Sequence, residues 1–147
     1  GAYMRKPLVI FGVGDYAQLA HFYFERDSEY EVSAFTVDAA YVQEDTFCGK
    51  PVIPFDEVVK YYSPEQNKMF VALGYSKLNL VRKERYLAAK SLGYRLGSYV
   101  SSRANVLNDG RVGENSFVFE DNTIQPFVLI GNNVTLWSGN HIGHHPL

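Results

Sequence analysis

The chain has 147 residues, of which 46% are hydrophobic and 20% are charged, so we expect one domain or two small ones with a packed core. The net charge is -2 and no long basic run occurs, which gives no support to binding of nucleic acid or of a membrane surface. The single cysteine, Cys48, cannot form an internal disulfide, and no apolar run is long enough to span a bilayer. We therefore expect a cytoplasmic protein with a buried or idle thiol.

The first predicted elements are a strand, a tight glycine loop and a helix. The apolar run at residues 8–11 ends at Gly12, and an amphipathic stretch follows it. Gly12, Gly14 and Ala17 match the phosphate-binding pattern, in which the first glycine allows a sharp turn and the second a close backbone approach. The N–H groups at the start of such a helix face an anion. We therefore assign substrate binding to Gly12, Gly14, Asp15, Tyr16 and Ala17.

Two further strands of this part end at residues suited to a ligand. The strand at residues 31–38 ends at Asp38, where dinucleotide-binding folds hold a ribose hydroxyl with a carboxylate. A short strand at residues 51–53 and a short helical segment come next. The buried strand at residues 68–74 then ends at Gly74. Asp38 and Gly74 join the predicted substrate-binding residues.

The clearest helix covers residues 76–93, with Ser76 as its cap and Gly93 at its end. Its expected apolar face consists of Leu78, Val81, Leu87 and Ala88. A strand at residues 94–100 completes a β-α-β-β-α-β-α-β order, which predicts a mostly parallel sheet with helices on both faces. A full dinucleotide fold needs two mononucleotide-binding halves, and one fits here, so a mononucleotide or a nucleotide sugar is favoured over NAD. The alternative is that the glycines only shape a turn.

The segment from Val100 to residue 147 has a period of six. Every block of six begins with an aliphatic residue, without a slip, and the fifth place is mostly small or β-branched, although Asn122, Asn140 and Pro146 depart from that. A period of six matches neither a helix nor simple strand alternation and is typical of a parallel β-helix. The aliphatic first places are Val100, Val106, Val112, Val118, Ile124, Ile130, Leu136 and Ile142.

Each block predicts a short strand and a corner, and three blocks close one triangular coil around the aliphatic side chains. Residues eighteen apart should stack at one strand spacing, ~4.8 Å. Trp137 follows an inward residue and should lie outside the coil. A solenoid needs a terminal cap and none is present, so we expect the natural chain to continue past residue 147. The predicted columns are Val106 with Ile124 and Ile142, Val112 with Ile130, and Val118 with Leu136.

The order of these parts resembles a known family. "GVGDYA", the strand ending in Asp38, "GYRLGSYVSSRA" at the junction and the hexads are together similar to bacterial sugar O- and N-acyltransferases of the sialic acid O-acetyltransferase type. The similarity runs from about Pro7 to the last residue. It implies a small Rossmann-like, nucleotide-sugar-binding domain at residues 4–98 and a left-handed parallel β-helix acyltransferase domain at residues 99–147.

This resemblance implies transfer of an acetyl group from acetyl-CoA to a hydroxyl or amino group of a nucleotide-linked sugar, in the synthesis of bacterial surface glycans. It also implies a homotrimer in which coenzyme A lies along the groove between β-helices. The family's catalytic histidine lies in a block of the type His-acid-x-x-Ile-Gly. His144 of "GHHPL" occupies the histidine place, and His145 stands where the family has an acid.

The histidines suit the chemistry that the resemblance implies. Acetyl transfer needs a base for the attacking hydroxyl or amine and donors for the oxyanion, and histidine titrates near neutral pH. His144 is third in its block and should point outward, so we predict it as the general base. His141, at a corner, and His145 could contact substrate or make structural hydrogen bonds. For His21, on the first helix, we expect a surface or packing role.

Other classes of function remain open. "HIGHH" could donate two or three imidazoles to zinc, as in β-helix enzymes of the carbonic-anhydrase type, although such an enzyme has no use for a glycine loop. A non-catalytic nucleotide-binding protein is the third class. The short sheet argues against an NAD-dependent oxidoreductase. We therefore predict an acetyltransferase without a metal site.

Overall fold

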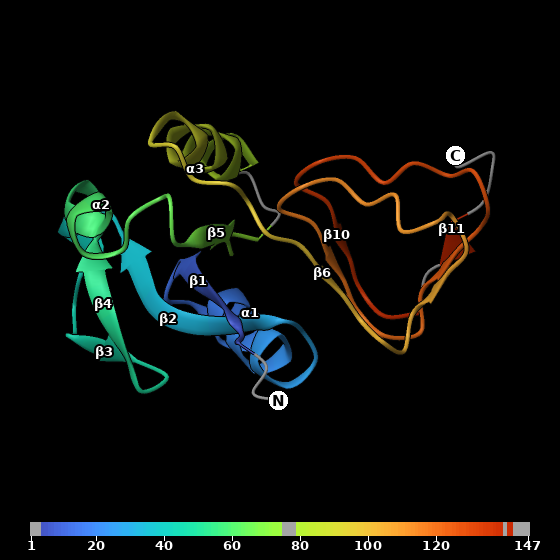
Figure 1. Cartoon of the computed structure of the whole chain (residues 1–147), viewed down its shortest axis with the longest axis horizontal. Coiled ribbons are helices and arrows are strands. Elements are labelled where there is room, and N and C mark those ends of the chain that lie inside the picture. Colours follow the sequence, from blue (N-terminus) through green and yellow to red (C-terminus); the bar gives the residue numbers. More distant parts are fainter. Residues whose placement is uncertain (1–3, 75–78, 140, 143–147) are drawn as a thin grey trace. The chain divides into compact units, whose positions relative to one another are not determined.

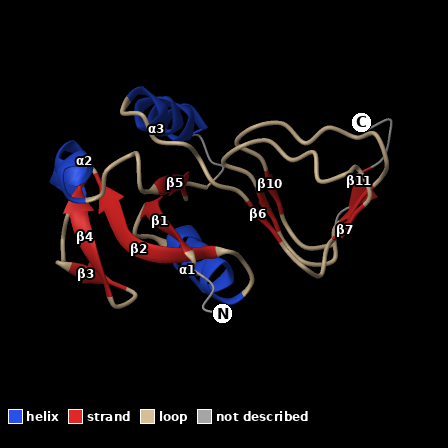
Figure 2. Cartoon of the chain, viewed as in Figure 1, coloured by secondary structure: helices blue, strands red, loops and turns tan. Residues whose placement is uncertain are grey.

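The structure is a computed structural model that describes residues 4–74, 79–139 and 141–142. The chain divides into two compact units, Gly1–Gly97 and Ser98–Leu147. Figure 1 shows a sheet with helices in the first unit and a stack of triangular turns in the second. Strands of both units are drawn in red in Figure 2, where those of the second unit are far shorter.

The first unit contains a five-stranded sheet of order β3-β4-β2-β1-β5. Strands β4, β2, β1 and β5 are parallel, and β3 pairs antiparallel to β4. The last four residues of β1 are all buried, as expected of a central parallel strand that is covered on both faces. The elements are β1 (Lys6–Phe11), α1 (Asp15–Arg26), β2 (Tyr30–Val37), β3 (Thr46–Phe47), β4 (Lys50–Pro54), α2 (Val58–Tyr61), β5 (Lys68–Val71) and α3 (Asn79–Ser91), with 3-10 turns at Ala39–Tyr41 and Phe55–Glu57.

Helices cover both faces of this sheet, as predicted. Neighbouring residues of a strand point to opposite faces, and β5 illustrates this. Its Phe70 ring contacts Phe24 of α1 at a centroid distance of 5.2 Å, whereas Met69 belongs to a cluster with Val58 of α2 and Tyr86 of α3. The predicted α/β class with a parallel sheet is therefore confirmed for this unit.

The buried face of α3 differs from the prediction. Val81 and Leu87 are 38% and 49% exposed, whereas Arg82 is 1% exposed. The buried residues Arg82, Tyr86 and Ala89 follow the spacing i, i+4 and i+7, which defines one helical face. Hydropathy selected the wrong face because arginine and tyrosine can bury long apolar stems beneath a polar end group. Ser76 and Leu78 lie outside the described residues.

The structure of this unit also differs from the sequence analysis in three smaller points. Instead of a strand at residues 94–100, Leu96 makes a single bridge to Met69, and the extended backbone resumes at Tyr99 in the second unit. The short strand β3 was not predicted. Cys48 is exposed, not buried, because it lies in the tight β3–β4 turn with a φ of 51°. Partial burial of its sulfur raises the pKa of the thiol, which agrees with an idle side chain.

The second unit is a three-sided coil of parallel pairs. One side is the sheet β10-β8-β6, a second is β11-β9-β7, and the third is the bridge between Val112 and Ile130. Paired residues are eighteen apart, so the predicted columns are confirmed, including Val118 with Leu136. The left hand of the coil stays a prediction. The strands are β6 (Tyr99–Val100), β7 (Asn105–Val106), β8 (Phe117–Val118), β9 (Thr123–Ile124), β10 (Thr135–Leu136) and β11 (His141–Ile142).

The interior of the coil contains the aliphatic first places and several fifth-place residues. Val118, Ile124, Val128 and Ile130 form its buried core, against which Ala104 and Val134 pack. Asn122 is fully buried in a fifth place because its amide donates to the carbonyls of Phe119 (2.8 Å) and Leu136 (3.1 Å). Buried polar groups are tolerated when they are hydrogen-bonded, so this departure from the small-residue pattern has a structural reason.

The corners of the coil have their own period of six. From the second block to the seventh, the fourth place has a positive φ, between 54° and 82°. Asparagine, aspartate and glycine tolerate this left-handed conformation, and they occupy every such corner except Phe127. Trp137 is 48% exposed and stacks on Phe119 with ring centroids 4.8 Å apart, so the prediction that it lies outside the coil is confirmed. The positive-φ corner residues are Asp109, Asn115, Asp121, Phe127, Asn133 and Gly139.

Candidate functional site

The loop after β1 requires glycine at its first position. Gly12 has a φ of 126°, and its N–H donates to the carbonyl of Thr36 at 2.9 Å. A Cβ at this position would lie 2.8 Å from the carbonyl oxygen of Ala72, which follows β5. A side chain is therefore excluded both by the backbone conformation and by the close approach of the neighbouring loop.

The second glycine of the loop precedes α1 and faces open space. Gly14 is the N-cap, with an extended backbone and no side-chain cap hydrogen bond, and a Cβ there would meet nothing within 4 Å. Asp15 is exposed, whereas Tyr16 and Ala17 are buried. The first N–H groups of a helix have no partner within the helix, so this end can accept an anion at the backbone of these residues.

The sheet order brings the predicted substrate-binding residues to one edge. Because β4, β2, β1 and β5 are parallel neighbours, their carboxyl ends meet there, followed by Asp38, Gly12 and Gly74. The chain moves from β1 to β2 on one side and later returns to β5 on the other. Ligands of open parallel sheets bind at such a switch point, outside the carboxyl ends. Gly74 is exposed, and a Cβ there would also meet nothing within 4 Å.

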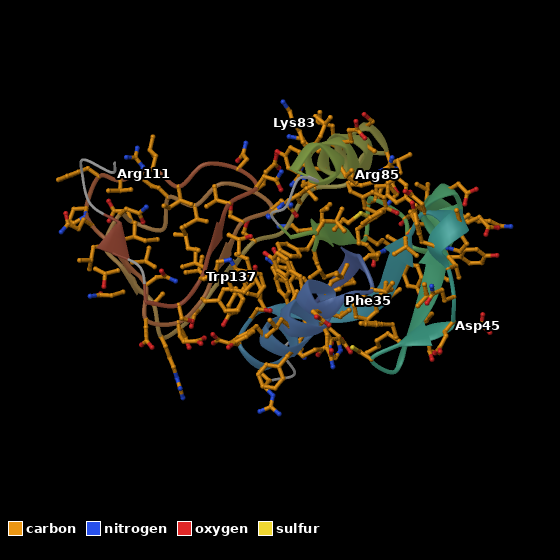
Figure 3. All side chains as sticks on the ribbon, turned by 180° about the vertical axis from the view of Figure 1, so that it is seen from behind. Phe35, Asp45, Lys83, Arg85, Arg111 and Trp137 are labelled. Carbon is orange, nitrogen blue, oxygen red and sulfur yellow. The ribbon has the colours of Figure 1, made fainter. Side chains whose placement is uncertain are left out.

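Asp38 has a partner that the sequence did not suggest. The Arg85 guanidinium donates from Nη1 to Asp38 Oδ1 at 3.1 Å, and the two side chains are 28% and 37% exposed. The same guanidinium lies 5.8 Å from the ring centroid of Phe55, just after β4. Figure 3 shows Arg85 on the side of α3 nearer the strands and Lys83 on its outer side. The spacing of Arg82, Arg85 and Tyr86 places them on one face of α3, but it does not identify Asp38 as a partner.

A pocket lies beside the glycine loop, next to Val13. Its volume is about 150 Å³, and it lies between Val13 of the loop and the segment that follows Asp38. Polar side chains and two aromatic rings line this pocket, so it offers hydrogen bonds beside an apolar surface. The lining residues are Val13, Tyr41, Gln43, Glu44, Thr46, Phe47 and Val52.

The predicted catalytic histidines are barely covered by the structure. The backbone of His141 lies in strand β11, paired with Thr123 of β9, so the prediction that it lies at a corner is wrong. Its side chain is outside the described residues. His144 and His145 also lie outside them, so the base assignment stays a prediction. Within the described part of the chain, no three His, Cys, Asp or Glu side chains converge as metal ligands. This finding does not reach the three histidines of the zinc alternative.

The fourth histidine, His21, packs in the first unit. Its Nε2 lies 4.0 Å from Glu25 Oε1, and its ring centroid is 5.8 Å from that of Phe35. Burial lowers the pKa of His21, although the Glu25 carboxylate acts in the opposite direction. The expected surface or packing role agrees with these contacts, which lie within α1 and β2.

The chain resembles solved structures of sugar acetyltransferases. The acetyltransferase domain of PglB from Neisseria gonorrhoeae FA1090, in complex with acetyl coenzyme A, matches 95% of this chain at 20% identity with a TM-score of 0.76. PerB from Caulobacter crescentus, in complex with CoA and GDP-perosamine, matches 92% at 24% identity with a TM-score of 0.75. The chain has the fold of these acetyltransferases. It spans 65% and 63% of the lengths of the two matched chains.

The other comparisons add little to this likeness. No protein-family profile and no curated protein sequence matches the chain. Across the described residues, every helix is too short or too polar to cross a membrane.

Proposed function

We propose that the protein takes part in transfer of an acetyl group from acetyl-CoA to a nucleotide-linked sugar. The observation that carries this proposal is the fold likeness, which extends over both units in the same order and covers more than nine tenths of the chain. The matched structures contain acetyl-CoA, or CoA with a nucleotide sugar. One of them is named a perosamine N-acetyltransferase, which favours an amino group over a hydroxyl as the acceptor.

The nucleotide part of the acceptor is assigned to a domain at residues 4–98, which corresponds closely to the first unit. Its phosphates would meet the N–H groups at the start of α1, next to Gly12 and Gly14, where no side-chain cap competes. Asp38 would accept a hydrogen bond from the ribose or the base, and Gly74 borders the same edge of the sheet. The pocket beside Val13 is large enough for part of a base.

The acyl-transfer step is assigned to a left-handed parallel β-helix at residues 99–147, which corresponds closely to the second unit. The acceptor amine or hydroxyl attacks the thioester carbonyl, the carbon–sulfur bond breaks, and the thiol of CoA leaves. His144 takes the proton from the attacking group and delivers it to the departing sulfur, so that CoA leaves as its thiol. His141 and His145 are the further catalytic candidates. In accordance with the resemblance, we also propose that the protein is a cytoplasmic homotrimer. Its reaction would belong to the synthesis of bacterial surface glycans.

Turnover tests the base assignment. Purified protein is assayed for thiol release from acetyl-CoA with GDP- and UDP-linked amino sugars as acceptors. His144→Ala should lower turnover by about 10²–10⁴-fold and leave nucleotide binding unchanged, because a general base contributes to the chemical step. His21→Ala, a histidine of the first unit, is the matched control and should retain turnover. Normal turnover in His144→Ala would contradict the assignment and move it to His141 or His145.

A further inference from the structure

The buried face of helix α3 contains arginine, although leucines of the same helix are exposed. Leu80 and Leu87 are 68% and 49% exposed, whereas Arg82 is almost fully buried and Arg85 is partly buried. Burial of apolar side chains is the main favourable contribution to folding, so this orientation forgoes stability. An arrangement of this kind suggests that a guanidinium is needed at the inner face.

Arg85 is held at two points beside the carboxyl edge. Nη1 donates to Asp38 Oδ1 at 3.1 Å, across 47 residues of sequence, and the guanidinium lies over the ring of Phe55. Its Nε is buried and has no hydrogen-bond partner in the described part of the protein. A buried donor without a partner costs free energy, so the guanidinium is placed for its contact with Asp38 at the expense of complete hydrogen bonding.

The contact uses one oxygen of the Asp38 carboxylate. Oδ1 accepts from Arg85, whereas Oδ2 accepts no hydrogen bond from the described residues. A carboxylate with one oxygen anchored has a fixed plane and a second oxygen in a defined direction.

We propose that Arg85 is a positioning residue that orients Asp38 so that Oδ2 accepts the hydrogen bond from the ribose 2′-hydroxyl of the nucleotide. This inference rests on the proposed function, because it assumes that a nucleotide binds at the glycine loop. It adds a specificity to that site, namely preference for a ribonucleotide over a 2′-deoxyribonucleotide. A carboxylate that turns freely would give a weaker preference, because its ordering has an entropic cost.

If the Arg85–Asp38 ion pair only stabilised the fold, different binding results would be expected. Ion pairs of this exposure contribute little to stability, and the loss of a purely structural one would lower the affinities for ribo- and deoxyribonucleotides equally. The ratio of the two affinities therefore separates the roles. A hydrogen bond to a charged group is worth about 1.5–3 kcal/mol, or roughly a 10- to 100-fold preference for the ribonucleotide in the intact protein.

Titration calorimetry with GDP, UDP and their 2′-deoxy forms tests the proposal on the full chain. Arg85→Gln and Asp38→Asn should each lower ribonucleotide affinity by about 10-fold or more and leave deoxyribonucleotide affinity nearly unchanged. The double variant should lose no more than either single variant, because both act through one hydrogen bond. Arg85→Lys should recover part of the preference. Lys83→Gln, the same loss of charge on the exposed face of α3, should match the wild-type protein.

The outcomes separate this inference from the proposed function. If Asp38→Asn loses the preference and Arg85→Gln keeps it, the positioning role is wrong while the nucleotide site stands. Equal weakening of ribo- and deoxyribonucleotides by Arg85→Gln, with a lower melting temperature, would assign Arg85 a structural role and overturn the inference. Absence of binding of either nucleotide to the wild-type chain would refute the nucleotide site and the inference with it.

Discussion

At the scale of single residues, the two glycines of the loop after β1 serve different needs. Gly12→Ala should lower the free energy of unfolding by about 1–3 kcal/mol, because it introduces a Cβ at positive φ and against the Ala72 carbonyl. Gly14→Val should change it by less than about 1 kcal/mol, since the space around Gly14 is open. Urea unfolding of both variants measures the difference. Equal stability of Gly12→Ala and the wild-type protein would contradict the close approach.

The same pair of variants separates folding from binding. Gly14→Val should fold normally and bind GDP or UDP more weakly, because its side chain occupies the space through which a phosphate reaches the helix start. Wild-type affinity in this variant would place the nucleotide elsewhere in the protein.

His21 gives the stability a dependence on pH. Its pKa in the folded protein is lowered by burial, so the folded state binds fewer protons than the unfolded state once the unfolded imidazole begins to charge. The free energy of unfolding should therefore decrease as the pH falls through about 6.5, and this contribution should vanish above that range, where both states are neutral. His21→Gln should flatten the profile, as measured by urea unfolding between about pH 5 and about pH 7.5. An unchanged slope would mean that other groups dominate.

At the scale of elements, the coil depends on small residues where successive turns touch. A Cβ on Gly113 would lie 2.5 Å from the carbonyl oxygen of Gly131 and would also meet Oδ1 of Asn132. Gly113→Ala should therefore destabilise the coil by about 1–3 kcal/mol. Gly131, eighteen residues later in the same block position, has open space around its Cβ, so Gly131→Ala is the matched control. Thermal unfolding followed by circular dichroism compares them, and similar melting temperatures would contradict the stacking.

The coil could be predicted closely because its period constrains every contact. A residue six positions away repeats the local geometry and one eighteen away is the neighbour, so Val112 and Ile130 could be paired from sequence. The α3 helix offered no such redundancy. Hydropathy predicts that Leu87 lies on the buried face of this helix. In the structure Arg82 is buried instead, because the contacts of the helix with the sheet determine which face is covered. Such tertiary contacts are not encoded in a single helix's periodicity.

In the candidate site too, local features could be predicted from the sequence and tertiary contacts could not. Local backbone geometry at Gly12 and the order of the strands could be inferred, because glycine patterns and apolar runs are local signals. The Arg85–Asp38 contact joins residues 47 positions apart and depends on the orientation of α3. It could not be derived before that orientation was known.

At the scale of the whole molecule, the two units differ in how much core each contains. Gly1–Gly97 has a five-stranded sheet with helices on both faces and fully buried residues such as Phe24 and Phe35. Ser98–Leu147 has strands of only two residues, and each turn of its coil contacts its neighbours in the stack. In solenoids, stability is a sum of repeat and interface contributions, so a short stack is weak by itself.

A fragment of residues 1–97 should therefore fold independently, whereas a fragment of residues 98–147 should not. A chain of about 50 residues buries a smaller fraction of its unfolded surface than a chain of about 100 residues, which is an ordinary size for a domain. Because the predicted nucleotide-binding residues all lie in the first unit, the 1–97 fragment should also bind GDP or UDP as the full chain does. Cooperative thermal unfolding and calorimetry measure the two properties, with Gly14→Val in the fragment as the binding control. A 1–97 fragment that melts cooperatively but binds neither nucleotide, beside a full chain that does, would mean that residues of the coil complete the nucleotide site.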